Sequence, residues 1–167
     1  IPVCYPFGFG LSYTAFAYSD LKLEKDLFTG EEMKVSFTIT NTGNRKGAET
    51  AQIYVKNPTG CHYLRTEKEL KGFIKTELLP GESKQVSVSL DERSFSVYDE
   101  KLQKFLMPSG EYQILVAASS QDVRLSASLS VKGVSYERDD RELLFEYFDP
   151  AVRIQEISHK QFLRLYG

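Results

Sequence analysis

The residues that could carry acid–base chemistry are scattered along this chain rather than gathered in a recognisable constellation. Two acidic pairs, Glu31-Glu32 and Asp139-Asp140, lie in polar stretches typical of solvated turns and helix starts. A carboxyl group acquires a catalytic pKa through burial or through a crowded like charge, and the sequence indicates neither at these positions. The pairs therefore indicate a solvated surface, and we predict no catalytic residue in this chain.

The histidines and cysteines are not spaced as the ligands of a metal centre. His62 follows Cys61, whereas Cys4 and His159 lie near opposite ends of the chain. Structural zinc sites use four such ligands at short spacings. No serine or cysteine nucleophile is arranged recognisably around His62. The sequence therefore predicts no metal and no cofactor, and two free thiols are favoured over a Cys4–Cys61 disulfide.

The composition is that of an ordinary globular domain. The 167 residues are 41% hydrophobic and 26% charged, with a formal net charge of −2. Nucleic-acid binding needs clustered Lys and Arg, and a membrane span needs a run of roughly 18 apolar residues. The chain shows neither pattern, so we predict no nucleic-acid or membrane partner. The first residue is Ile1 rather than Met, which fits a domain excised from a longer protein. A cytoplasmic location is slightly favoured if that parent is bacterial.

Alternation of apolar and polar residues predicts an antiparallel β-sandwich over residues 19–132. Successive side chains of a strand point to opposite faces, so Met33, Val35 and Phe37 share one face. Turn residues rich in Pro, Gly and Asn separate the runs. Seven or so short strands at this spacing favour an all-β fold of the immunoglobulin or fibronectin III type. The apolar positions recur at 51, 53, 55, then 86, 88, 90, then 112, 114, 116, and finally 125, 127, 129, 131, with Gln52 and Tyr54 expected outward.

Residues 133–167 are predicted to form a short helical extension or linker. In 136–148 acidic residues precede an apolar cluster, which suits the N-terminal end of a helix dipole. Ser158 and Gln161 match a capping box, so 158–166 is predicted to be a second helix. Such a short helix is marginal alone in water. We therefore expect it to pack on the sandwich or on a domain outside this chain.

Residues 1–18 are predicted to be an irregular connector. The segment 5–13 reads Tyr-Pro-Phe-Gly-Phe-Gly-Leu-Ser-Tyr, in which proline fixes φ and the glycines allow backbone conformations that β-carbons forbid. Irregular backbone cannot easily bury this many rings within one small sandwich. We therefore predict that these aromatic side chains pack against a neighbouring domain: Tyr5, Phe7, Phe9 and Tyr13.

The same segment strongly resembles the join in glycoside hydrolase family 3, the β-glucosidase group, between the second catalytic domain and a fibronectin type III-like domain. Motifs of that domain follow in the family's order at 41–43, 52–55, 69–73, 79–82, 97–99, 108–112 and 119–125. Two features depart from the family pattern. Thr66 follows Arg65 where members often carry Arg-Pro, and the extension lies outside the usual domain. Its residues 157–162 and 165–167 resemble a connecting segment of some bacterial members, and the domain order of the parent stays open.

The resemblance implies a non-catalytic accessory domain. The family's retaining mechanism uses two carboxylates about 5–5.5 Å apart. By resemblance, the nucleophilic Asp belongs to the barrel domain and the acid/base Glu to the second domain, and neither segment is present here. The parent is therefore expected to be a glycosidase that hydrolyses terminal β-linked sugars. This fragment alone is not expected to be an enzyme. Its expected partners are the catalytic domains of the same polypeptide, with a homo-oligomer contact as a further option.

Two other interpretations stay open from the residues. The loop 57–68 carries His62, Tyr63 and Arg65, which could reach a neighbour or the substrate entrance, although a plain surface loop is favoured. An independent carbohydrate- or protein-binding module is the alternative function. The absence of Trp and the aromatic connector count against that module, and a complete small enzyme lacks any constellation to support it.

Overall fold

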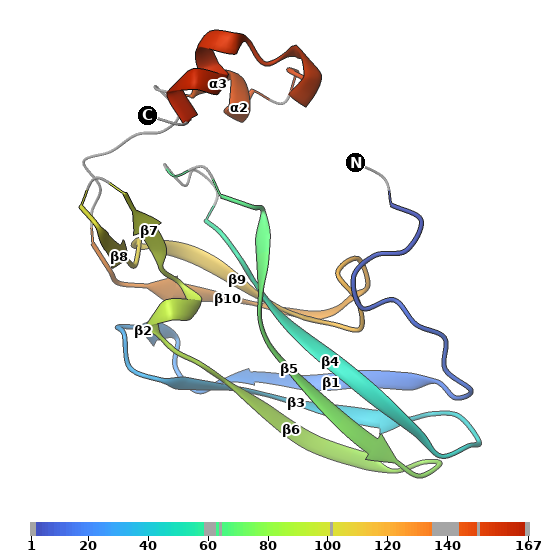
Figure 1. Cartoon of the computed structure of the whole chain (residues 1–167). Helices are drawn as coiled ribbons and strands as arrows, with labels where there is room; N and C mark the ends of the chain where they lie inside the picture. The colour runs from blue at the N-terminus through green and yellow to red at the C-terminus, as the bar shows by residue number, and fades with distance from the viewer. Residues whose placement is uncertain are drawn as a thin grey trace.

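Two β-sheets pack face to face in a sandwich (Figure 1). The computed structural model describes residues 3–58, 63, 65–100, 102–134, 144–149 and 151–165. One sheet has the strand order β1-β3-β6 and the other has the order β2-β10-β9-β4-β5, while β7 and β8 form a small hairpin. The strands are β1 (Phe16–Leu23), β2 (Leu27–Phe28), β3 (Met33–Asn41), β4 (Gly47–Lys56), β5 (Lys68–Leu78), β6 (Ser83–Leu90), β7 (Val97–Asp99), β8 (Lys104–Leu106), β9 (Gly110–Ala117) and β10 (Val123–Val131).

The neighbouring strands pair antiparallel, except for the short parallel pairing of β2 with β10. The predicted alternation is confirmed in β3, whose Met33, Val35 and Phe37 are fully buried in the space between the sheets. In register with β6, Val35 lies opposite Val88 and Phe37 lies opposite Val86. Each fully buried side chain of this size contributes about 1.5–3 kcal/mol to folding, so these pairs fix the register of the sheet. The predicted all-β sandwich is therefore confirmed.

The centre of the five-stranded sheet is covered on both faces. In β4, Ala51, Ile53 and Val55 face the other sheet, as predicted. Gln52 and Tyr54 lie on the opposite, outer face, but they are only 4% and 5% exposed. The expectation that these two side chains face solvent is therefore wrong. Other parts of the chain therefore cover these two side chains.

Two short helices follow the sandwich, as predicted, and Figure 1 shows them beyond the end that carries β7 and β8. They are α2 (Phe145–Phe148) and α3 (His159–Leu165), with a 3₁₀ turn at Ile154–Glu156 between them. The Ser158 hydroxyl accepts a hydrogen bond from the Gln161 N–H, so the predicted N-cap is present. The second half of the predicted capping box is replaced, because the Ser158 N–H donates to the Glu146 carboxylate at 2.6 Å. The expected start of the first helix falls in 135–143, outside the described residues.

Candidate interdomain surface and loop anchor

The connector, here residues 3–15, keeps its aromatic side chains at the surface. Tyr5 is 75% exposed and Tyr13 is 91% exposed, and Phe7 and Phe9 are exposed as well. The rings of Tyr5 and Phe9 stand 5.4 Å apart, because the Phe9 N–H donates to the Pro6 carbonyl and closes a turn between them. The four rings predicted to contact another domain therefore lie where such a contact can form.

The backbone of the connector is fixed to the outer face of the five-stranded sheet. The Phe7 carbonyl accepts a 2.8 Å hydrogen bond from the Ser120 N–H, in the turn between β9 and β10. Figure 1 shows the connector (blue) running beside this turn before it enters β1. Gly8 has a φ of +82° and lies against Gln52, so close that a β-carbon at position 8 would overlap the Gln52 amide. Both the backbone conformation and the available space therefore require glycine here.

A small cluster of side chains lies on the outer face where the connector crosses it. Tyr54, Leu115 and Ala117 are buried together on this face, separate from the main core. The Tyr54 hydroxyl donates to Gln52 Oε1 at 2.6 Å, and burial raises the pKa of Tyr54 above its usual value. The Lys68 ammonium lies 5.5 Å from the centre of the Tyr54 ring and also donates to the Ser120 carbonyl. Gln52 thus has a fixed orientation under Gly8.

The C-terminal end of the connector is held by Asn41. Asn41 is fully buried, and its Oδ1 accepts from the Thr14 hydroxyl at 2.7 Å and from the Gly43 N–H at 3.1 Å. Its Nδ2 donates to the Arg45 carbonyl at 2.7 Å and to the Leu78 carbonyl at 3.1 Å. Both donors and both acceptor directions of this amide are therefore engaged, by one side chain and three backbone groups. The connector is fixed at two points, near Phe7 and at Thr14.

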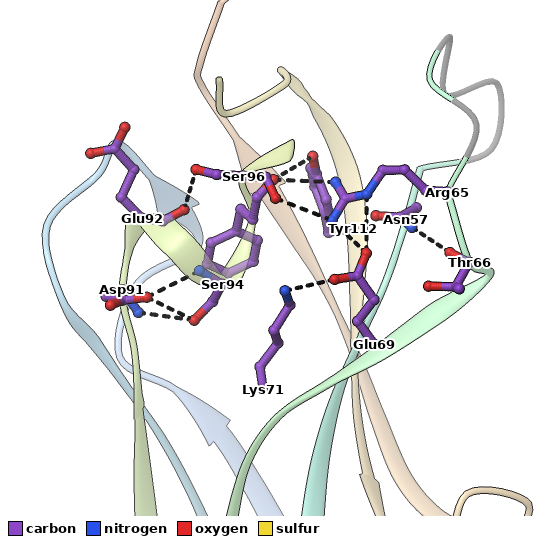
Figure 2. Close-up of polar contacts among 11 residues, drawn as sticks. Asn57, Arg65, Thr66, Glu69, Lys71, Asp91, Glu92, Ser94, Ser96 and Tyr112 are labelled. Atoms are coloured by element: carbon purple, nitrogen blue, oxygen red, sulfur yellow. Dashed lines mark hydrogen bonds and ion pairs between the residues drawn. The ribbon is translucent and has the colours of Figure 1, made fainter. Parts of the chain in front are cut away.

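The long loop between β4 and β5 is anchored by two inward-pointing side chains. Tyr63 is buried, and its hydroxyl donates to the Asp99 carboxylate at 2.7 Å. The Arg65 side chain is only 5% exposed and bonds Glu69 Oε1 through Nε and Nη2, at 3.1 and 2.7 Å. The guanidinium also donates through Nη1 to the Phe95 carbonyl and through Nη2 to the Ser96 carbonyl, each at 3.4 Å. Figure 2 shows this guanidinium between the loop and the turn that carries Ser96.

Glu69 and Lys71 complete the anchor. The Lys71 ammonium donates to Glu69 Oε2 at 2.7 Å, so both carboxylate oxygens have cationic partners. Burial alone would raise the pKa of Glu69, but the hydrogen bonds from Lys71 and Arg65 outweigh it and leave that pKa below its ordinary value. The carboxylate therefore stays ionised and holds Arg65 in place.

The turn that receives Arg65 is itself stiffened by local hydrogen bonds. Asp91 caps the 3₁₀ turn Glu92–Ser94, since its carboxylate accepts from the Ser94 N–H at 3.0 Å while the Ser94 hydroxyl accepts from the Asp91 N–H. The Ser96 hydroxyl donates to the Glu92 carbonyl at 2.7 Å. Figure 2 shows these contacts beside the Arg65 anchor. The two carbonyls that accept from Arg65 are therefore presented by a rigid segment.

Comparison with known proteins identifies the family to which this chain belongs. A family model described as fibronectin type III-like domain matches residues 49–120. The thermostable beta-glucosidase B of Acetivibrio thermocellus is 43% identical over 128 residues, which are 76% of this chain and 17% of that protein. The structure of beta-glucosidase 3B from Thermotoga neapolitana superposes with a TM-score of 0.70 at 38% identity, over 80% of this chain and 18% of the other. The chain is the fibronectin type III-like domain of the family 3 β-glucosidases. It spans less than a quarter of the length of these relatives.

The helical extension of this fibronectin type III-like domain also has a counterpart in a solved structure. The GH3 beta-glucosidase of Bifidobacterium adolescentis superposes over 98% of this chain and 23% of its own, with a TM-score of 0.75 and 32% identity. The match with the Bifidobacterium structure therefore extends past β10. The Thermotoga structure, by contrast, covers only 80% of this chain. The segment with α2 and α3 is thus shared with at least one solved relative, and is not peculiar to this chain.

The residues singled out by sequence reasoning are only partly described in this domain. His62 and Cys61 lie outside the described residues, while Cys4 is a free and exposed thiol. Tyr63 and Arg65 point into the domain, so their side chains fix the base of the loop. Whether the loop contacts a neighbour stays a prediction.

The anchoring roles of Asn41 and Glu69 were not predicted from the sequence. The only local signals were the turn around Gly43 for Asn41 and the run of charged residues after Arg65 for Glu69. Within the described ranges, no group of three or more His, Cys, Asp or Glu side chains could hold a metal ion, and no helix is long and apolar enough to cross a membrane.

Proposed function

We propose that this fibronectin type III-like domain is a non-catalytic accessory domain of a family 3 β-glucosidase. Its role is to pack against the catalytic domains of the same polypeptide, where terminal β-linked sugars are hydrolysed by the retaining mechanism. In this proposal the connector is 1–18, the sandwich is 19–132 and the extension is 133–167. The observation that supports it best is a connector whose backbone is fixed to the sheet while its rings face outward.

The contrast between a fixed backbone and exposed rings is what favours docking. Phe7 and Gly8 are tied to the outer face by the Ser120 hydrogen bond and by contact with Gln52. Their position is therefore set before any partner arrives, which lowers the entropy lost on docking. Exposed apolar side chains that gather in one place mark interaction sites more often than they mark bare surface. A rigid, aromatic connector thus suits a permanent contact between domains.

The anchored loop supports the same role in a second place. Tyr63 and Arg65 hold the base of the loop 57–68 against the end of the sandwich. In this proposal the side chains of the loop that are not used as anchors, including His62, reach the neighbouring domain or the substrate entrance. A loop presented from fixed ends can make such a contact with little loss of conformational entropy.

The first test compares hydrolysis of aryl β-glycosides by this chain alone and by the full-length parent. We expect an active parent and an inactive fragment. Reproducible turnover by the fragment, abolished by changing its own carboxylates, would overturn the accessory role.

The second test replaces connector rings in the full-length parent, with Phe7→Ser and Phe9→Ser combined. Because the rings would lose their buried contact, we expect the catalytic activity to decay at lower temperature in a heat-inactivation series. Leu79→Ser, an exposed change in the turn between β5 and β6, is the matched control. Equal inactivation curves for the double variant and the control would contradict the packing role of the connector.

A further inference from the structure

Two apolar side chains of β5 remain exposed on the outer face of the five-stranded sheet. Phe73 is 69% exposed and Leu70 is 38% exposed. In register, Phe73 lies opposite Gln52 and Leu70 lies opposite Tyr54. Residues directly opposite in an antiparallel pair share one face, with β-carbons about 4.5–5.5 Å apart. Both exposed side chains therefore stand beside the cluster on which the connector rests.

The connector and these side chains of β5 form a continuous surface. Gln52 contacts Gly8 on one side and is the cross-strand neighbour of Phe73 on the other. Phe7 and Phe9 flank Gly8 in the chain and are exposed. Aromatic rings thus lie on both sides of the point where the connector crosses Gln52.

On the outer face, the apolar positions of β5 are confined to this part of the strand. Farther along the same face, Lys75 pairs with Thr50 and Glu77 pairs with Ala48, so the outer positions become charged. β5 is also the last strand of its sheet. Edge strands of a free surface normally carry charged side chains that discourage association. A large exposed ring on this edge, next to further exposed rings, marks a surface that another structure covers.

We propose that Phe73 and Leu70 join the connector rings in one docking surface, and that the catalytic domain attached to the connector occupies it. This inference rests on the proposed function and adds to it the outer face of the sheet. A domain joined by the connector is held at high effective concentration beside this face, because the connector is fixed at Phe7 and at Thr14. The relatives provide a partner of this kind, since the chain covers only 17% to 23% of their length.

Cysteine protection in the full-length parent tests the surface directly. Phe73→Cys and Leu70→Cys are prepared separately, and alkylation at each position by iodoacetamide is followed by peptide mass spectrometry. Leu79→Cys is the exposed control on the turn after β5, and Phe7→Cys reports on the connector. Rates measured in denaturant normalise the intrinsic reactivity of each site. Activity towards an aryl β-glucoside confirms that each variant is folded.

We expect alkylation at positions 73 and 70 to be about tenfold or more slower than at position 79, since burial protects a group against reaction. Equal rates at 73, 70 and 79 would overturn this inference. If position 7 is then still protected, the proposed function stands without the sheet surface. If position 7 also reacts freely, both fail. Protection that disappears on dilution would assign the surface to a second copy of the protein and overturn the tethered occupant.

Discussion

Gly8 and Gln52 are packed so closely that the Gln52 amide takes the place where a β-carbon of residue 8 would stand. The contact joins a segment before the first strand to the centre of the five-stranded sheet. Gly8 has a positive φ of +82°, and its chain neighbours Phe7 and Phe9 are both exposed. This contact, together with the Ser120–Phe7 hydrogen bond, therefore fixes where the connector crosses the sheet.

Gly8→Ala should destabilise the domain for two separable reasons. The left-handed backbone costs roughly 1–2 kcal/mol for a residue with a β-carbon, and the methyl group collides with Gln52. The double variant Gly8→Ala/Gln52→Ala removes the collision and should recover part of the loss in urea denaturation. Gly10→Ala is the matched control, because nothing lies within 4 Å of a β-carbon there. An equal effect of the two glycine substitutions would contradict this account.

Tyr18 should make the domain sensitive to alkaline pH. Its hydroxyl donates to Glu49 Oε1 at 2.7 Å, and burial, together with that hydrogen bond and the charge of Glu49, raises the pKa of Tyr18 well above its usual 10.0. The phenol stays protonated in the folded state while it ionises in the unfolded state above about pH 10. The contribution of Tyr18 to the free energy of unfolding is therefore complete below pH 10 and is lost as the pH rises beyond that value.

The measurement is the free energy of unfolding between pH 8 and about pH 11, within the range where the unfolded phenol titrates. We expect Tyr18→Phe to flatten the decline with pH that the unmodified domain shows. Tyr13→Phe, at a ring that is 91% exposed, should leave the slope unchanged. A slope that is the same in all three proteins would show that Tyr18 does not titrate as described.

The sandwich could be predicted from the sequence because alternation is a local signal. Met33, Val35 and Phe37 show it directly, and all three are in the core. The same signal was misleading at Gln52 and Tyr54, where the outer face was expected to meet water. Gln52 is covered by Gly8, from a segment before the first strand, and the Lys68 ammonium lies over the Tyr54 ring. Strand periodicity carries no information about contacts between such separate segments.

The contacts that define the candidate site were less predictable still. The glycines of the connector indicated unusual backbone, and Gly8 does have a positive φ. Nothing local indicated that its partner is Gln52, or that Tyr63 would turn inward to Asp99, 36 positions later. A polar residue with a long-range partner looks like a surface residue in the sequence, because its hydrogen bonds depend on the tertiary fold.

Asn41→Ala should loosen the join between the connector and the sandwich. The change removes the acceptor for Thr14 and leaves the Leu78 and Arg45 carbonyls without their amide donor. Each buried polar group left unsatisfied costs about 1–3 kcal/mol. Hydrogen exchange of the Gly43 amide, which donates to Asn41 Oδ1, should accelerate along with the global loss of stability.

Thr40→Ala provides the control for Asn41. Its hydroxyl shares an exposed hydrogen bond with Ser83, whose loss water can compensate. We expect little change in stability or in exchange near the connector. If Thr40→Ala and Asn41→Ala had similar effects, the special role of the buried amide would be ruled out.

Arg65→Met should release the loop between β4 and β5 and weaken the end of the sandwich. The guanidinium is buried and serves Glu69 and the Phe95 and Ser96 carbonyls, whereas a thioether can replace only its volume. Loss of hydrogen bonds to a charged group costs about 1.5–3 kcal/mol. Arg65→Lys keeps the charge but not the planar fork of donors. Its stability in urea denaturation should therefore lie between that of the unchanged domain and that of Arg65→Met.

The pH dependence separates this ionic role of Arg65 from simple packing. The pKa of Glu69 is held below its ordinary value, so its contribution is complete above the unfolded pKa of about 4.3 and is lost as the pH falls through the folded value. Without Arg65 the folded pKa rises towards the unfolded one, and the acid loss of stability should shrink. Lys46→Met, which removes an exposed partner of Glu77, should change stability by less than about 1 kcal/mol. An Arg65→Met protein with an unaltered acid slope would mean that Glu69 does not depend on the guanidinium for its charge.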